Sequence, residues 1–266
     1  MSQFFDPFDP NILIFDKLDS TSLEAKRIID AGNAEHGLII WAKEQIKGKG
    51  RGDKIWHSYN GNLTMSVIIK LTKNFANYSL YPFIVAIAIK EALEKEGVDG
   101  LEFKWPNDIL LNHKKIAGIL LESKIKWSEE NFLICGIGLN IANYPKEIKN
   151  ATCLEKEKFR IDDIGKILFL IIANIGNYLD KIDQAKYHKS IYEEWLKSAY
   201  NLGKEITVID GNKKIRGVFE TIDHGNLILK NADKKHIIST GEVFFKDEYS
   251  DTGNDNNNIA YLNRDK

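Results

Sequence analysis

The sequence predicts an α+β protein, with a mixed or antiparallel sheet flanked by helices and a small C-terminal β-barrel. Apolar residues at helical spacing occur in 81–97 and 161–183, and four β-rich segments lie between these helices with only short polar breaks. Short connections favour antiparallel neighbours over the long crossovers of a doubly wound sheet. From Gly203 onward, short strands alternate with glycine- and asparagine-containing turns, which is typical of a small barrel.

The N-terminal half is expected to alternate strands with helices. Gly32 and Gly97 are placed where a helix can end, and the glycine-dense 47–54 must form a loop. The predicted strands are 11–15, 37–45 and 62–71, and the predicted helices are 20–32 and 81–97.

The middle and the C-terminal part follow the same reasoning. The expected strands of the middle are 101–105, 108–112, 115–127 and 131–140, and the expected helices after them are 161–183 and 187–200. The domain boundaries are therefore placed at 1–200 for the main domain and 201–248 for the barrel. The tail 249–266 is rich in asparagine and aspartate and is predicted to be disordered.

Composition excludes several classes of protein. In a chain of 266 residues, 37 basic residues against 38 acidic ones give a formal net charge of −1, which disfavours a dedicated nucleic-acid binder. The longest apolar run, 167–173, is far shorter than the roughly 20 residues of a membrane span, and no secretory signal is visible at the start. The two cysteines, Cys135 and Cys153, exclude a disulfide scaffold and a cysteine-based zinc site, so a cytoplasmic location is expected.

The segment 47-KGKGRGDKIW-56 is the first candidate for chemistry. Three glycines within five residues let backbone N–H groups approach a ligand, and the lysines and arginine among them supply charge for an anion. The spacing is neither that of a P-loop nor that of a dinucleotide-binding fingerprint. The alternative is a mobile, solvated basic loop.

Two further candidates are 104-KWPNDIL-110 and 114-KKIAGIL-120. A carboxylate fixed at a strand entry beside a lysine can hold Mg²⁺ next to a nucleotide phosphate, although Asn107 and Asp108 could simply form a turn. Regular strand alternation puts Lys115 on the opposite face from Gly118, and the lysine could reach a cleft or merely end the strand.

The last two candidates are 136-GIGLN-140 and 19-DSTSLEAK-26. Glycines at the end of an apolar strand can mark a bulge or tight packing instead of a site. Thr21 and Glu24 have the spacing of a capping box, but a helix N-terminus can also bind a polar ligand through its free N–H groups.

Together and in this order, the motifs D-S-T, Q-x-x-G-x-G-R, K-W-P-N-D, K-x-x-G-I-L and G-I-G-x-N resemble the biotin–protein ligase family. The resemblance is strong over residues 12–145 and implies a class II synthetase-like catalytic domain followed by an SH3-like barrel. It also implies that biotin is activated by ATP as biotinyl-5′-AMP and then transferred to a lysine of a biotin carboxyl carrier domain. Only 18 residues precede Asp19, too few for a helix-turn-helix domain, so a ligase without a repressor function is expected.

The resemblance also implies roles for individual residues. Lys115 and Arg51 are the expected catalytic residues, because they can neutralise the two anions that must meet. Magnesium is expected at Asp108. Trp56 and Trp105 are expected mainly to pack, with Trp56 near the nucleotide. The biotin-binding residues are expected to be Ser20, Thr21, Ser22, Gln45, Lys49, Gly50, Arg51, Lys115 and Gly118, and the nucleotide-binding residues Lys54, Trp56, Asn107 and Asn140.

The glycine-rich loop departs from the family pattern. Lys49 and Lys54 replace arginines and Asp53 replaces a usual glycine, so the bidentate forks of arginine are lost and retention of the adenylate could be weaker. The stretch 144–160, where the family covers the adenine, contains no tryptophan.

The expected ligands and partner are ATP, Mg²⁺, biotin and the carrier domain of acetyl-CoA carboxylase or of another biotin-dependent carboxylase, with neither DNA nor membrane. A homodimer is left open. The rival functions are a lipoate–protein ligase or octanoyltransferase of the same fold, and a non-catalytic small-ligand sensor.

Overall fold

The structure is a computed structural model that describes residues 11–52, 54–71, 75–125, 130–232 and 234–245. Its chain divides into two compact units. The N-terminal unit contains residues up to Phe103 together with Asn107–Ser198, and the C-terminal unit contains Lys104–Pro106 and the chain from Ala199 onward. Asp53 and the tail 249–266 lie outside the described residues.

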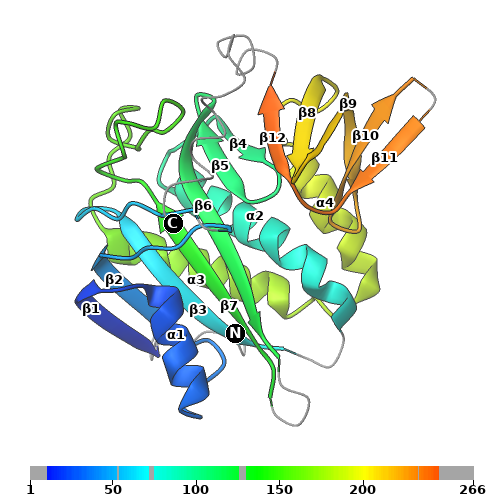
Figure 1. The fold of residues 1–266 in the computed structure, drawn as a ribbon. Helices are drawn as coiled ribbons and strands as arrows, with labels where there is room; N and C mark the ends of the chain where they lie inside the picture. The colour runs from blue at the N-terminus through cyan, green and yellow to red at the C-terminus, as the bar shows by residue number, and fades with distance from the viewer. Residues whose placement is uncertain (1–10, 53, 72–74, 126–129, 233, 246–266) are drawn as a thin grey trace. The chain divides into compact units, whose positions relative to one another are not determined.

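A seven-stranded sheet with the order β1-β2-β3-β7-β6-β5-β4 forms the centre of the N-terminal unit (Figure 1). β1 and β2 are parallel, whereas β2–β3, β3–β7, β7–β6 and β6–β5 are antiparallel, so the predicted mixed sheet is confirmed. The strands are β1 (Ile12–Leu18), β2 (Ile39–Gln45), β3 (Leu63–Lys70), β4 (Leu101–Lys104), β5 (Asp108–Leu111), β6 (Lys114–Lys124) and β7 (Phe132–Leu139).

Helices cover both faces of this sheet (Figure 1). On one face, Ala25 and Ile29 of α1 pack with Ile40, Ile68 and Ile134 of the strands. α2 and α3 lie on the other face, where β3 and β7 are also buried. The helices are α1 (Thr21–Asp30), η1 (Phe75–Leu80), α2 (Tyr81–Lys95), α3 (Ile164–Leu179), η2 (Ala185–Tyr187) and α4 (His188–Leu196).

The α1 side of the sheet has little side-chain bulk at its centre. The cross-strand register places Thr64, Gly138, Gly118 and Asp108 in one row across β3, β7, β6 and β5. Because strand residues alternate between faces, Gly136 and Ser66 lie on this same face, one pair further along. We call the side that carries Gly118, Gly136 and Gly138 the glycine face. It is open to a ligand wherever no side chain fills it.

The alternation expected for β6 is wrong at its first residues. Ile109 pairs with Ala117 but Leu110 pairs with Lys115, so β6 has one more residue than β5 at this point. Such a bulge reverses the facing of the residues before it. As a result, the Lys115 Nζ lies 3.2 Å from the position that a Cβ on Gly118 would occupy, on the same face as Gly118.

Helix boundaries differ from the expected ones for local reasons. α3 begins at Ile164, not at 161, because Asp163 is the N-cap and its Oδ1 accepts a hydrogen bond from the Lys166 N–H at 3.0 Å. The expected helix 187–200 is a short 3₁₀ turn followed by α4, which ends at Leu196. Phe83 of α2 contacts Tyr192 and Trp195 of α4, with ring centroids 5.1 and 5.2 Å apart.

The C-terminal unit is a five-stranded antiparallel sheet with the order β11-β10-β9-β8-β12, the small SH3-like barrel expected from the sequence. Its interior contains Val208, Phe219, Leu227 and Leu229, each at most 2% exposed. Trp105 belongs to this unit and donates a hydrogen bond from Nε1 to the Gly225 carbonyl at 3.3 Å, as expected for a packing residue. The strands are β8 (Glu205–Asp210), β9 (Lys213–Asp223), β10 (Asn226–Asn231), β11 (Lys234–Ile238) and β12 (Glu242–Phe245).

Candidate active site

The start of α1 and the glycine face form a cluster of buried hydroxyl groups. Ser20, Thr21 and Ser22 are each at most 4% exposed. The Thr21 Oγ1 lies 2.8 Å from the Ser66 Oγ, and the Ser22 Oγ lies 3.2 Å from it. Gly136 is next to this cluster, since a Cβ on it would lie 3.0 Å from the Ser22 Oγ. We call Thr21, Ser22 and Ser66 the hydroxyl cluster. It offers donors and acceptors to a polar, uncharged group.

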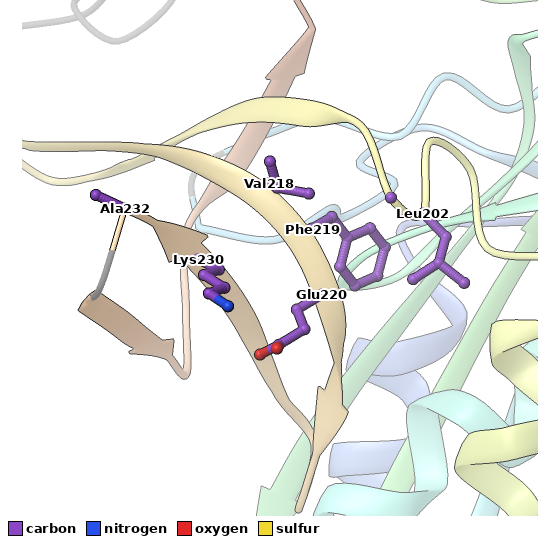
Figure 2. A pocket seen from close by; sticks show the side chains of 7 residues that line it. Leu202, Val218, Phe219, Glu220, Lys230 and Ala232 are labelled. Atoms are coloured by element: carbon purple, nitrogen blue, oxygen red, sulfur yellow. The ribbon is translucent and has the colours of Figure 1, made fainter.

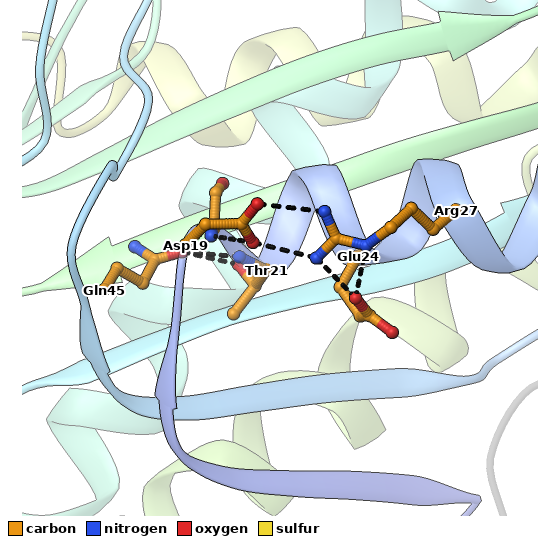
Figure 3. Close-up of polar contacts among 6 residues, drawn as sticks. Asp19, Thr21, Glu24, Arg27 and Gln45 are labelled. Atoms are coloured by element: carbon orange, nitrogen blue, oxygen red, sulfur yellow. Dashed lines mark hydrogen bonds and ion pairs between the residues drawn. The ribbon is translucent and has the colours of Figure 1, made fainter.

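α1 begins without the capping box that its sequence suggests. The N-cap, Ser20, makes no side-chain hydrogen bond to the helix. Instead, the Gln45 Oε1 accepts from the Thr21 backbone N–H at 2.7 Å and from its hydroxyl at 3.1 Å (Figure 3). Glu24 bonds to Arg27, whose Nε donates to it at 2.7 Å. Gln45 therefore joins the end of β2 to the helix N-terminus, and its amide nitrogen remains near Gly48.

Arg27 also fixes the residue before the helix. Its two terminal nitrogens donate to both carboxylate oxygens of Asp19, at 2.9 and 2.8 Å (Figure 3). These bonds lower the pKa of Asp19 to about 2, with a further contribution from the Ser20 backbone N–H. The D-S-T motif thus enters α1 in a fixed geometry.

The glycine-rich loop is a tight hairpin. The Trp56 N–H donates to the Gly48 carbonyl at 2.9 Å, and the Gly50 N–H donates to the Lys54 carbonyl at 2.8 Å. A Cβ on Gly48 would lie 2.3 Å from the Trp56 carbonyl oxygen, so only glycine permits this approach. Lys49 and Lys54 are exposed on the hairpin.

The hairpin places Trp56 on the glycine face. A Cβ on Gly138 would lie 2.2 Å from the indole, and one on Gly118 would lie 3.1 Å from it. The Lys115 Nζ lies 5.6 Å from the centroid of the same ring. Trp56, Lys115 and the two glycines therefore meet at one place, and the buried indole nitrogen has no hydrogen-bond partner among the described residues.

Lys115 and Arg51 bring positive charge to this place. The Lys115 Nζ forms an ion pair of 2.7 Å with the Asp108 Oδ1, and about a third of the lysine side chain is exposed. The Arg51 Nη1 donates to the Asn107 Oδ1 at a longer 3.4 Å. Asn107 is itself fixed, because its Nδ2 donates to the Ile119 carbonyl at 2.7 Å. One cation lies on the sheet and the other on the hairpin, and two such cations can together bind an anion.

Asn140 lies behind this cluster and not in the open. It is 3% exposed, and its Nδ2 donates to the Thr152 carbonyl at 3.1 Å. Its role in nucleotide binding stays a prediction. The same holds for the roles of the exposed Lys49 and Lys54.

Sequence reasoning missed Ser66 and Asn62. Asn62, Thr64 and Ser66 are polar residues at alternate positions of the segment 62-NLTMSVIIK-70, and that pattern was available in the sequence. Ser66 is fully buried and completes the hydroxyl cluster.

Asp108 is the carboxylate that pairs with Lys115. Among the described residues, no group of three or more His, Cys, Asp or Glu side chains is placed to bind a metal ion. One carboxylate suffices for a Mg²⁺ ion that arrives on nucleotide phosphates, so the expected role of Asp108 stays a prediction.

A cavity in the C-terminal unit does not belong to the candidate active site. The C-terminal unit has a cavity of about 480 Å³, lined by none of the residues predicted for the site (Figure 2). It is lined by Leu202, Gly203, Val218, Phe219, Glu220, Lys230 and Ala232.

Of the helices in the described ranges, none combines the length and the apolar character that crossing a bilayer requires.

Comparison with known proteins agrees with both units. The profile of the Biotin/lipoate A/B protein ligase family matches residues 14–140, and that of the Biotin protein ligase C terminal domain matches residues 202–246. The chain belongs to the biotin protein ligase family.

Relatives of this family resemble the chain over most of its length. The biotin–[acetyl-CoA-carboxylase] ligase of Paracoccus denitrificans is 29% identical over 238 residues, which cover 86% of this chain and 98% of that protein. The bifunctional ligase/repressor BirA of Bacillus subtilis is 31% identical over 177 residues, and the match spans 54% of that relative's length. The solved biotin protein ligase of Aquifex aeolicus in complex with biotin and ATP is 28% identical, with a TM-score of 0.76 over 89% of this chain and 98% of that one.

Proposed function

We propose that this member of the biotin protein ligase family activates biotin with ATP and transfers it to a lysine of a biotin carboxyl carrier domain. One observation supports this more than any other. The hydroxyl cluster lies beside Gly136 and the Lys115 ammonium beside Gly118 on the same glycine face, where the Trp56 indole covers Gly138, so we propose that one small molecule with a polar ring and a carboxylate binds along this face. Biotin has a urea-containing ring at one end and a carboxylate at the other.

In the first step, a carboxylate oxygen of biotin forms a bond to the α-phosphorus of ATP, and the bond to pyrophosphate breaks. The two reactants are both anions and repel each other. Lys115 and Arg51 are the cations placed to reduce this repulsion and to stabilise the charge of the transition state. Bound Mg²⁺ would neutralise phosphate charge, and the carboxylate proposed to contact it is Asp108.

In the second step, the ε-amine of the acceptor lysine attacks the acyl carbon of biotinyl-5′-AMP. The amide bond forms, AMP leaves with the electrons of the broken bond, and the amine loses its proton. Lys115 again lies where negative charge develops. The hydroxyl cluster and Gln45 would keep the ring in place between the two steps, so the acyl carbon stays in position.

The partner is the carrier domain of acetyl-CoA carboxylase or of another biotin-dependent carboxylase, and the proposed location is the cytoplasm. The printed name of the Paracoccus denitrificans relative supports this choice. A homodimer is a further proposal, which sedimentation of the purified chain would test.

The alternative acid is lipoate or octanoate, because the matched profile of residues 14–140 includes lipoate ligases. The profile of the C-terminal unit is that of biotin ligases and favours biotin.

The test offers the protein Mg-ATP, an acceptor domain and one acid at a time, and measures pyrophosphate release and acceptor mass. We expect biotin to be attached to one lysine and lipoate and octanoate to remain unused. Attachment of lipoate instead of biotin would show that the substrate is lipoate and not biotin. Binding of biotin without pyrophosphate release would make the protein a sensor.

A further inference from the structure

Asn62 makes an unusual set of hydrogen bonds just before β3. It is 3% exposed, and its Oδ1 accepts from three consecutive backbone N–H groups, those of Ile141, Ala142 and Asn143, each at 3.0 Å. Its Nδ2 donates to the Asn143 carbonyl at 2.8 Å. The side chain of a single residue therefore fixes the whole turn that follows β7.

The residue before Asn62 permits this contact. Gly61 has a φ of +89°, and a Cβ on it would lie 2.9 Å from the Ala142 Cβ. A side chain here would be strained and would push the turn away. The sequence Gly61-Asn62 thus brings the backbone close to the turn and supplies the amide that binds it.

The turn after β7 also fixes the segment around Thr152. The carbonyls of Asn140 and Ile141 accept from the N–H groups of Leu154 and Glu155, at 3.1 and 3.0 Å. The Asn140 Nδ2 donates to the Thr152 carbonyl at 3.1 Å, and the Asn140 Oδ1 lies 3.4 Å from the Asn62 Nδ2. Two buried amides therefore connect the start of β3 to this segment.

The segment 150–152 forms hydrogen bonds with both the N–H and the carbonyl of Lys115. The Lys115 N–H donates to the Asn150 carbonyl at 2.7 Å, and the Thr152 N–H donates to the Lys115 carbonyl at 2.9 Å. Lys115 lies at the bulge of β6, where the register between β5 and β6 shifts by one residue. The segment 150–152 therefore supplies the hydrogen bonds that define the backbone of Lys115 there.

We propose that Asn62 is a positioning residue for Lys115, acting through the turn 140–143 and the segment 150–152. Asn62 does not touch a reacting atom. It sets the place of the ammonium over Gly118, and so it controls the rate of adenylate formation more than the binding of the acid. This inference rests on the proposed function, because it assigns a catalytic consequence to a structural network.

The test replaces Asn62 by alanine and compares it with Asn143→Ala as a matched control. The control lies in the same turn and removes one exposed side-chain hydrogen bond, to the Asn60 carbonyl at 3.2 Å. At saturating biotin and ATP, and well below the unfolding temperature, we expect Asn62→Ala to lower kcat for adenylate formation by about 10-fold or more. The dissociation constant of biotin should change less than about 2-fold, because the hydroxyl cluster is untouched.

A second readout does not depend on catalysis. Hydrogen exchange of the Ile141, Ala142 and Asn143 amides should be faster in Asn62→Ala, since these N–H groups lose their acceptor. Asn62→Asp keeps an acceptor oxygen for the three N–H groups and loses the Nδ2 donor, so it should retain slow exchange and recover part of kcat. This variant also carries the test if Asn62→Ala does not fold.

The outcomes separate the two proposals. A lowered unfolding temperature with unchanged kcat would make Asn62 purely structural and overturn the inference. Equal losses of kcat in Asn62→Ala and Asn143→Ala would do the same. Wild-type protein that forms no adenylate would refute the proposed function, and with it the catalytic meaning of the network.

Discussion

At the scale of single residues, the site depends on where Lys115 lies. The sequence identified the lysine, but regular alternation placed it opposite Gly118, and one additional residue in β6 reverses this. A bulge is defined by the register of two strands, which a single strand's sequence does not contain. Ser66 and Asn62 were missed for a different reason. Their partners, Thr21 and the turn 140–143, are distant in the chain.

Lys115→Ala should lower the rate of adenylate formation by about 10²- to 10³-fold, the scale for removing one preorganised charge in a site. The reason is that, in the proposed mechanism, the ammonium over Gly118 neutralises the carboxylate and the phosphate where they meet. The rate of pyrophosphate release at saturating substrate concentrations measures this effect. Lys114→Ala, on the adjacent residue, is the matched control. Turnover of Lys115→Ala near that of wild type would remove the residue from the mechanism.

At the scale of elements, periodicity predicted the type and order of the helices and strands, and local chemistry set their ends. Asp163 caps α3, which begins at Ile164, three residues after the expected start. α1 has no side-chain cap of its own, since Gln45 from β2 bonds to Thr21. That bond joins two elements, so the capping-box pattern in the sequence indicated a local structure that a tertiary contact replaced.

The Asp19–Arg27 pair predicts a pH dependence at the entry to α1. The pKa of Asp19 falls from 3.8 to about 2 in the folded protein, so its contribution to stability is complete above its unfolded pKa. That contribution is lost as the pH falls through about 2. Asp19→Asn should therefore reduce the free energy of unfolding by up to about 1 kcal/mol at neutral pH.

Denaturant unfolding of both proteins across pH 7 to 2 measures the difference between them. The difference should shrink between about pH 4 and 2, and Arg27→Gln should reproduce it. A difference that stays constant over this range would show that the ion pair contributes nothing that depends on the charge of Asp19.

At the scale of the whole molecule, the sequence predicted the α+β class and the small C-terminal barrel, but not the strand order. β7 lies between β3 and β6, and its pairing with β3 joins residues 63–70 to 132–139. This long-range pairing brings Gly136 and Gly138 beside α1, the hairpin and Lys115. Only the assembled sheet creates the glycine face, which is why the motifs had to be interpreted jointly and not one at a time.

The most direct test of this account is mass spectrometry of the products formed from biotin and Mg-ATP in the absence of an acceptor protein. We predict biotinyl-5′-AMP and pyrophosphate in equal amounts, formed about 10²- to 10³-fold more slowly by Lys115→Ala. A wild-type protein that leaves both substrates unchanged, although folded and able to bind biotin, would contradict the central claim.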